Sequence, residues 1–323
     1  SSAAVDSETV YPWVVSEAGE HWRIEATSAA DETVRLELRA ADGTNLGRAS
    51  DSGRAALFDL ALEAGSYEIV VPRIGREGQA FEVAAFPETT RFDPEPNDEA
   101  ARAAPLLDGA VVSGRLARSG SDDDRYRLTI APGDTRLRDV VLRRSDELST
   151  TLCLEDLERT ALQCRAGQGP QALTDLVLEP GDHIVAVYGS ESETEPYELE
   201  VLAGAPRPED REAEPNDSAL TPDVHAGLTT VGGRVSRIDD DFHEFEIAGD
   251  PQLWRVAVDA APGTIDALDW IRGNQVVAQS RPSCREAPAV LEDLYLSTGR
   301  HRFMVSGCAP DELDKDEYTL TLT

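Results

Sequence analysis

The stretch Asp175-Leu-Val-Leu-Glu-Pro-Gly-Asp-His-Ile-Val-Ala-Val187 decides the fold, because the chain contains it three times. Its counterparts run from Asp59 to Val71 and from Asp293 to Val305. Each copy begins with Asp-Leu, carries a second Leu two residues later, places a Gly in a turn and then alternates apolar residues. This pattern predicts one β-hairpin, repeated. The copies start at residues 59, 175 and 293. These intervals are the size of a domain, so each copy marks one small domain.

The sequence around these hairpins predicts an all-β protein. Val34-Arg-Leu-Glu-Leu-Arg39 alternates apolar and charged residues, as a strand with one buried face does. Similar short stretches recur between turn residues, with almost no helical periodicity. One helical turn is expected at Asp98–Ala104, with Asp98 as its N-cap. We therefore expect three tandem antiparallel β-sandwiches. We name them the first unit (1–88), the second unit (89–203) and the third unit (204–323).

Composition restricts the class of partner. The chain has 62 acidic and 30 basic residues, a formal net charge of −32. A charge of this sign repels nucleic acid phosphates and anionic lipid headgroups, so we expect no nucleic acid partner. Cations and basic protein surfaces are better suited. No apolar run approaches the roughly 20 residues of a spanning helix, so no membrane-spanning segment is expected.

The four cysteines predict two disulfides within units. Cys153 and Cys164 lie in two short segments of the second unit that a hairpin would bring together, and Cys284 and Cys308 lie in the third unit. A zinc site is the alternative, although the sequence has no Cys-x-x-Cys pair and no matching His spacing. Disulfides indicate an oxidising compartment. The start Ser1-Ser-Ala-Ala-Val5 is typical of a chain after signal-peptide removal, or of a trimmed chain. We therefore expect an extracytoplasmic location, periplasmic or secreted.

A second motif recurs at the start of the second and third units. It reads Asp93-Pro-Glu-Pro-Asn-Asp98 and Glu212-Ala-Glu-Pro-Asn-Asp217. Each copy is followed, about 25 residues later, by an acidic cluster just before a strand. These clusters are Asp122-Asp-Asp-Arg-Tyr126 and Asp239-Asp-Asp-Phe-His243. The first unit lacks Glu-Pro-Asn-Asp. There the sequence predicts that Glu20-His-Trp22 takes the place of the acidic cluster.

This combination of Glu-Pro-Asn-Asp, Asp-x-Asp before an aromatic residue and a Leu-x-Pro-Gly turn resembles bacterial pre-peptidase C-terminal (PPC) domains. The collagen-binding domains of clostridial collagenases are related to them. The resemblance covers almost the whole chain as three tandem copies and implies jelly-roll-like β-sandwiches that are secreted. It also implies that the two acidic motifs of one unit chelate a single Ca²⁺ ion. PPC domains usually accompany a hydrolase, and this chain departs from that pattern by containing the modules alone.

The resemblance carries the calcium ligands over residue by residue. Calcium prefers six to eight hard oxygen ligands, and crowded carboxylates repel one another unless a cation neutralises them. The alternative is that these residues form ordinary solvated acidic turns. The ligands implied in the second unit are Asp93, Glu95, Asn97, Asp98, Asp122 and Asp124. Those implied in the third unit are Glu212, Glu214, Asn216, Asp217, Asp239 and Asp241.

No pattern in the sequence indicates catalysis. His-Glu-x-x-His, Gly-x-Ser-x-Gly and a Gly-rich phosphate loop are all missing from the sequence. His183 and His301 align with Tyr67 after the turn glycine, and His243 aligns with Tyr126, so these histidines are expected to be sandwich residues. We therefore expect a protein without enzymatic activity.

The sequence favours a binding or scaffolding role. We expect an accessory subunit that docks on a larger membrane or cell-surface assembly through a protein partner, with the first unit as the docking surface. The alternative is a calcium-dependent module that binds an extracellular matrix or polymer and is associated with a hydrolase.

Overall fold

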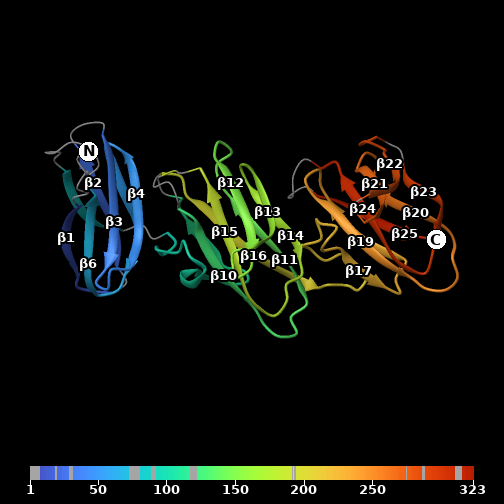
Figure 1. Ribbon diagram of the computed structural model, residues 1–323, viewed down its shortest axis with the longest axis horizontal. Coiled ribbons are helices and arrows are strands. Elements are labelled where there is room, and N and C mark those ends of the chain that lie inside the picture. The colour runs from blue at the N-terminus through green and yellow to red at the C-terminus, as the bar shows by residue number, and fades with distance from the viewer. Residues whose placement is uncertain are drawn as a thin grey trace, which may run out of the picture.

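The computed structural model shows three β-rich lobes in a row, with the N-terminus in the first lobe and the C-terminus in the third (Figure 1). Nearly all regular structure is strand, arranged in mainly antiparallel sheets, and the fold is all-β as predicted. Among the described residues, no helix has the length and apolar character to cross a membrane. The structure describes residues 8–18, 20–28, 32–72, 81–88, 92–116, 122–190, 192, 194–273, 275–285, 288–309 and 315–323.

The first unit contains a sheet in the order β1-β6-β3-β4 and a sheet in the order β5-β2-β7. Apolar side chains of both sheets, such as Ile24, Leu36 and Leu60, form one buried core. The strands are β1 (Glu8–Val15), β2 (Glu20–Ser28), β3 (Thr33–Ala40), β4 (Asn45–Ser52), β5 (Arg54–Leu62), β6 (Gly65–Pro72) and β7 (Phe81–Glu88).

The second unit has sheets in the orders β13-β12-β15-β10-β8 and β14-β11-β16-β9. A core that includes Tyr126, Leu154 and Val201 lies between them. Strand β16 continues to Pro206, three residues beyond the predicted end of the unit. The strands are β8 (Ala104–Leu106), β9 (Val111–Gly114), β10 (Asp124–Ile130), β11 (Arg136–Arg143), β12 (Ser149–Glu155), β13 (Ala161–Gln168), β14 (Gln171–Leu176), β15 (Gly181–Gly189) and β16 (Tyr197–Pro206).

The third unit repeats this topology strand for strand, as β17-β19-β24-β21-β22 and β18-β25-β20-β23. Its core includes Phe245, Val256 and Leu320. The strands are β17 (Asp223–Ala226), β18 (Thr230–Val235), β19 (Asp240–Ile247), β20 (Gln252–Ala260), β21 (Ile265–Arg272), β22 (Gln275–Ser280), β23 (Ala289–Leu296), β24 (Gly299–Gly307) and β25 (Asp316–Leu322).

The aspartate that opens each repeated hairpin lies in a β-bulge. Asp59, Asp175 and Asp293 have φ values of 53°, 58° and 54°, in the left-handed region. At each one the register shifts, so that two residues of β5, β14 or β23 lie opposite one residue of β2, β11 or β20. Asp tolerates this backbone conformation better than most residues. The bulge bends the strand and changes the direction of its outer edge.

The strand register corrects one sequence alignment. Thr9, Asp124 and Asp241 lie opposite Val71, Val187 and Val305 of the three equivalent hairpins. Strand β1 is therefore the counterpart of β10 and β19, and Tyr11 corresponds to Tyr126 and His243. The prediction that Glu20-His-Trp22 occupies this place was wrong. Trp22 lies in β2, on the other sheet, directly before the register shift between β2 and β5. Its aromatic side chain resembles Tyr126 in sequence context but not in position.

The histidines that align with Tyr67 share its structural role. The hydroxyl of Tyr67 donates to the carbonyl of Glu63 at 2.8 Å. The Nε2 atoms of His183 and His301 lie 2.8 and 2.7 Å from the carbonyl oxygens four residues before them. In each unit the ring therefore closes the hairpin turn. The expectation that these two histidines are structural agrees with these contacts.

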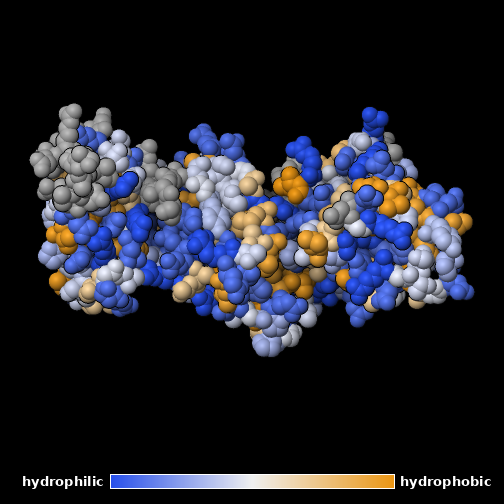
Figure 2. Space-filling view, in the orientation of Figure 1, coloured by the Kyte–Doolittle hydropathy of each residue, from blue (hydrophilic) through white to orange (hydrophobic). Residues whose placement is uncertain are grey.

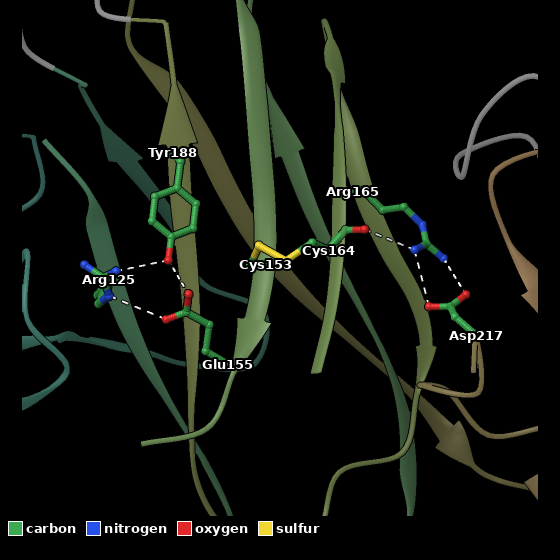
Figure 3. The surroundings of a disulfide bond; sticks show 7 residues. All are labelled: Arg125, Cys153, Glu155, Cys164, Arg165, Tyr188 and Asp217. Carbon is green, nitrogen blue, oxygen red and sulfur yellow. Dashed lines mark hydrogen bonds and ion pairs between the residues drawn. A yellow bond between two sulfur atoms is a disulfide. The ribbon is translucent and has the colours of Figure 1, made fainter. Parts of the chain in front are cut away.

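Both predicted disulfides are present, Cys153–Cys164 and Cys284–Cys308, and the zinc alternative was wrong. Cys153 and Cys164 are directly opposite each other on β12 and β13. Figure 3 shows this bond between two groups of charged side chains, with Arg125 on one side and Arg165 on the other. The bond links β12 to β13 at Cys164, the residue before Arg165.

The helical turn is shorter than predicted. A 3₁₀ turn spans Ala100–Arg102, and Glu99 occupies the N-cap position without a side-chain cap. Asp98 instead accepts a hydrogen bond from the Asp123 N–H at 3.1 Å. The predicted N-cap role of Asp98 was therefore wrong, because its carboxylate binds the backbone N–H of Asp123 and not the N–H groups of the turn.

The visible surface is mostly hydrophilic, with apolar side chains in small separate groups (Figure 2). Single exposed apolar residues such as Leu220 and Val14 are common on soluble folds.

Gly114 tests how tightly the sandwich is packed beside the acidic residues. A Cβ atom at Gly114 would lie 2.2 Å from the Tyr197 ring. We therefore expect Gly114→Ala to lower the free energy of unfolding by about 1–3 kcal/mol through overpacking. Urea denaturation measures this change. Gly204→Ala, where the nearest atom would be 3.4 Å away, is the control. Equal stability of the two variants would contradict the packing.

Candidate functional site

The linker into the second unit is bound to the edge of the first. The N–H of Glu95 donates to the carbonyl of Asp59 at 3.0 Å, and the N–H of Ala61 donates to the carbonyl of Glu95 at 2.8 Å. These two bonds make a parallel bridge between Leu60 and Glu95 on the outer edge of β5. The peptide bond from Glu95 to Pro96 is cis. We call this arrangement joint 1.

The linker into the third unit repeats the arrangement, which we call joint 2. The N–H of Glu214 donates to the carbonyl of Asp175 at 3.1 Å, and the N–H of Val177 donates to the carbonyl of Glu214 at 2.9 Å. The bridge lies on β14, between Leu176 and Glu214, and the peptide bond after Glu214 is again cis. The main chain of each linker thus continues the sheet of the preceding unit.

An arginine from the following unit pairs with the bulge aspartate at each joint. Arg115 Nη2 lies 2.6 Å from Asp59 Oδ2, and Arg234 Nε lies 2.6 Å from Asp175 Oδ2. The Arg115 guanidinium also lies over the rings of Phe58 and Phe92, at 4.6 and 4.8 Å from their centroids. Both bulge aspartates are buried. A buried carboxylate needs such a partner, so the arginines fix the orientation of the units.

Next to joint 1 the structure gathers all the acidic residues predicted as ligands in the second unit. Oxygen atoms of Asp93, Glu95 and Asp124 lie within 4.8 Å of one another, and so do those of Glu95, Asp98 and Asp122. Glu95 belongs to both groups. Asn97 is fully buried beside them and donates to Asp93 at 2.6 Å. We call these six residues the joint 1 cluster.

The joint 1 cluster leaves buried oxygens without a hydrogen bond from the described residues. They are Glu95 Oε1, Asn97 Oδ1 and Asp124 Oδ1. Burial raises the pKa of Glu95 and of Asp124 well above the usual range, and the neighbouring carboxylates raise it further. Unpaired buried acceptors on crowded carboxylates are what a hard cation requires, so this donor set fits Ca²⁺.

In the third unit the chain itself places positive charge on three of the equivalent carboxylates, Glu214, Asp217 and Asp239. Lys315, the chain's only lysine, has a fully buried side chain whose Nζ lies 2.6 Å from Asp239 and 3.4 Å from Glu214. From the second unit, Arg165 reaches across joint 2 to Asp239 and Asp217, at 2.5 and 3.0 Å (Figure 3 shows the pair with Asp217). An ammonium and a guanidinium therefore supply positive charge where a metal would supply it.

Joint 1 lacks both of these residues. The register places Ala49 of β4 where β13 has Arg165. Thr194 lies three residues before Tyr197, as Lys315 lies three residues before Tyr318. A cavity of about 350 Å³ opens at joint 1, and Asp98 and Asp122 line it. Arg48, Arg102 and Arg159 also line this cavity. The cavity therefore borders the joint 1 cluster, with both carboxylates and guanidinium groups in its lining.

All six ligands predicted in the third unit also lie at joint 2. Glu212 and Asp241 form a further group with His243, and Glu214, Asp217 and Asp239 form another. Asn216 is fully buried, as Asn97 is. Asn216 and Asp241 also have buried oxygens without a hydrogen bond from the described residues. The repeated sequence motif thus named residues that the structure brings together in both units. It missed Lys315 and Arg165, which belong to no repeated motif.

The structure also reveals a buried chain of hydrogen bonds that the sequence did not indicate. His225 Nε2 lies 3.0 Å from His243 Nδ1, and His243 Nε2 lies 2.5 Å from the hydroxyl of Tyr318. Tyr318 donates to Glu212 at 2.9 Å. Burial lowers the pKa of both histidines, which favours their neutral forms. His243 thus occupies the core position expected for it.

The cavity at joint 1 is lined by many ionisable side chains. Its lining combines carboxylates and guanidinium groups with apolar residues and Asn45. No Ser, Thr, Cys or His is among the described residues that line it. The arrangement therefore suits ion binding better than nucleophilic catalysis.

Comparisons with known proteins give only remote likenesses. No family model matches the chain, and no curated protein matches it. A structure described as the triple jelly roll fold and turret assembly of an archaeal virus is 11% identical, covers 98% of this chain and 80% of its own, and has a TM-score of 0.23. The exported protein XepA of PBSX is 13% identical, over 62% of this chain and 83% of its own, with a TM-score of 0.20. At these TM-scores the two structures indicate nothing about the role of this chain.

Loss of the arginine should open joint 1. Arg115→Ala leaves Asp59 buried without its cation, which costs about 3 kcal/mol or more. We expect the Ala61 amide to lose protection from hydrogen exchange and small-angle scattering to show a larger radius of gyration. Arg255→Ala, which removes an exposed pair with Glu292, is the control. An unchanged Ala61 amide in Arg115→Ala would contradict the role of this pair.

Stability in the presence of a chelator should depend on pH through the joint 1 cluster. The raised pKa of Glu95 means that the folded chain holds this proton more tightly than the unfolded chain, where the pKa is about 4. The free energy of unfolding should therefore fall as pH rises above the unfolded-state pKa of about 4. We expect Glu95→Gln, which cannot ionise, to show a shallower fall in urea denaturation. Glu99→Gln, at an exposed position, is the control. Identical slopes for Glu95→Gln and the unaltered chain would contradict this assignment.

Proposed function

We propose that this protein is a non-catalytic extracytoplasmic scaffold whose three β-sandwich units are held at fixed angles. The observation that carries the proposal is the construction of the two joints. Each linker glutamate extends the edge of the preceding sheet, and each following unit supplies an arginine to the buried bulge aspartate. A flexible tether requires neither feature. The joints hold the ends of the molecule at a fixed separation, which suits an accessory subunit that positions a protein partner on a larger assembly.

Within this proposal, joint 1 takes a Ca²⁺ ion. Glu95, Asn97 and Asp124 have buried oxygens without a hydrogen bond from the described residues, and further carboxylates surround them. Six to eight oxygen ligands suit calcium, and the joint 1 cluster contains enough carboxylate and amide oxygens. The ion would neutralise the cluster and hold the linker against the second unit. The resemblance to PPC domains agrees with this assignment.

Joint 2 takes no metal in this proposal. Lys315 and Arg165 already place two positive charges on the Asp239 carboxylate. An added divalent cation would meet these charges at close range, and the repulsion disfavours binding. The two units thus use the same acidic motif with different cations.

The extracytoplasmic location is supported by the two disulfides, which persist in oxidising compartments. Calcium-binding modules outside the cell commonly have dissociation constants of about 10⁻⁴ to 10⁻³ M, which is adequate where calcium is abundant. The net charge of −32 favours partners with basic surfaces.

Exchanging the cations between the joints tests the calcium assignment. We expect calorimetric titration to show one Ca²⁺ bound by the unaltered chain, at joint 1. Lys315→Thr combined with Arg165→Ala gives joint 2 the residues of joint 1 and should add a second ion. Ala49→Arg combined with Thr194→Lys should abolish binding. The reason is that the first pair of substitutions removes two positive charges from joint 2, and the second pair adds two positive charges at the equivalent positions of joint 1.

Two controls separate ion binding from unfolding. Circular dichroism should confirm that each variant keeps its strands, and Asp42→Asn, at an exposed turn, should leave the titration unchanged. Absence of binding heat in the unaltered chain, or equal binding by all the variants, would contradict a calcium site at joint 1. Unchanged scattering on adding chelator would contradict its role in fixing the joint.

A further inference from the structure

The third unit carries the same edge that receives the linkers at joints 1 and 2. Asp293 lies in the equivalent bulge, with φ 54°, and Leu294 and Tyr295 follow it as Leu60 and Ala61 follow Asp59. Strand β23 is at the end of its sheet and pairs with β20 on one side. No described residue makes a backbone hydrogen bond with the carbonyl of Asp293 or the N–H of Tyr295 on the outer edge.

The accessibility of this edge distinguishes it from the other two. Asp59 and Asp175 are 2% and 4% exposed, whereas Asp293 is exposed. Tyr295 is 64% exposed and lies opposite Leu253, which is 63% exposed. The edge therefore combines backbone groups, a carboxylate and two apolar side chains on an open surface. Open strand edges are the sites at which another polypeptide adds by backbone pairing.

We propose that the outer edge of β23 at Asp293–Tyr295 is a third docking site, and that it receives the linker of a further module of the same design. Such a linker would place an extended glutamate, followed by Pro-Asn, on the edge through the carbonyl of Asp293 and the N–H of Tyr295. The module after it would place an arginine on the Asp293 carboxylate. This inference goes beyond the proposed function, because it needs the construction of the joints and not the calcium site.

The chemistry of the occupant follows from the two joints that are filled. Arg115 and Arg234 each follow their linker glutamate by 20 residues and pair with the aspartate of the preceding unit. Asp293 is an exposed acidic residue, so an arginine suits it by charge as well as by position, while the neighbouring Glu292 pairs with Arg255. A second copy of this chain is a poorer occupant. Its linker glutamates Glu95 and Glu214 are already bound within their own joints.

The first test uses the unaltered chain and amide hydrogen exchange. The Ala61 and Val177 amides are hydrogen-bonded to the linkers, so they should exchange slowly. The Tyr295 amide should exchange about tenfold faster or more, because its edge is open. A Tyr295 amide as slow as those of Ala61 and Val177 would overturn the proposal, since the edge would then already be covered.

The second test adds the occupant. A copy of residues 203–323 joined after Thr323 gives the new linker the spacing it has at joint 2, because Thr323 corresponds to Leu202. We expect the Tyr295 amide of this extended chain to slow to the rate of Val177, and scattering to fit a fixed row of four units. A fast Tyr295 amide together with scattering from a freely hinged fourth unit would overturn the proposal.

Variants of the extended chain show whether the edge itself is responsible. Tyr295→Pro removes the outward N–H, and Asp293→Arg reverses the charge that meets the incoming arginine. Both should release the added unit, whereas Tyr295→Phe should keep it bound. Retained docking in Tyr295→Pro and Asp293→Arg would overturn the proposed site. Each measurement is repeated with calcium and with chelator. The result at β23 should be the same in both, so failure of this site and failure of the calcium site at joint 1 can be told apart.

Discussion

The arrangement of the units depends on one constraint, the pairing of each linker glutamate with the edge strand of the unit before it. On the outer edge of the strand, the carbonyl of Asp59 or Asp175 and the N–H two residues later bind the linker glutamate. The two hydrogen bonds contribute only about 1 kcal/mol each. The buried Arg–Asp pair adds orientation, because separating the units would leave a carboxylate without its partner. Backbone pairing and charge pairing therefore fix both the position and the angle of the next unit.

The same constraint explains why carboxylates are concentrated at the joints. Each linker brings its acidic residues against those at the start of the next unit's first long strand, and all of them become buried or half-buried. Burying several carboxylates together is unfavourable without positive charge. At joint 2 the chain provides that charge through Lys315 and Arg165, and the Cys153–Cys164 disulfide holds the strand that carries Arg165. At joint 1 the equivalent positions hold Ala49 and Thr194, so the chain supplies neither charge there, and we propose that an external cation supplies it.

This division has a consequence for how the molecule would respond to its surroundings. In the proposed arrangement Lys315 and Arg165 supply the positive charge of joint 2, so its geometry would not depend on the ions in solution. Joint 1 would stiffen or loosen with the concentration of a divalent cation, while the sandwiches on both sides keep their own cores. A row of units with one permanent joint and one ion-dependent joint can be a rigid spacer under one condition and a hinged one under another.

The sequence by itself determined the fold class, the three repeats, both disulfides and the acidic residues that meet at each joint. These follow from local patterns: period-two alternation, turn glycines, cysteine positions and a motif written twice. It misplaced Trp22, because aromatic residues recur on both sheets and only strand pairing distinguishes them. Only the tertiary structure showed which basic side chains reach the carboxylates of joint 2. Lys315 lies 101 residues from Glu214 along the chain, and Arg165 comes from a different unit, so no spacing in the sequence connects them to the carboxylates they bind.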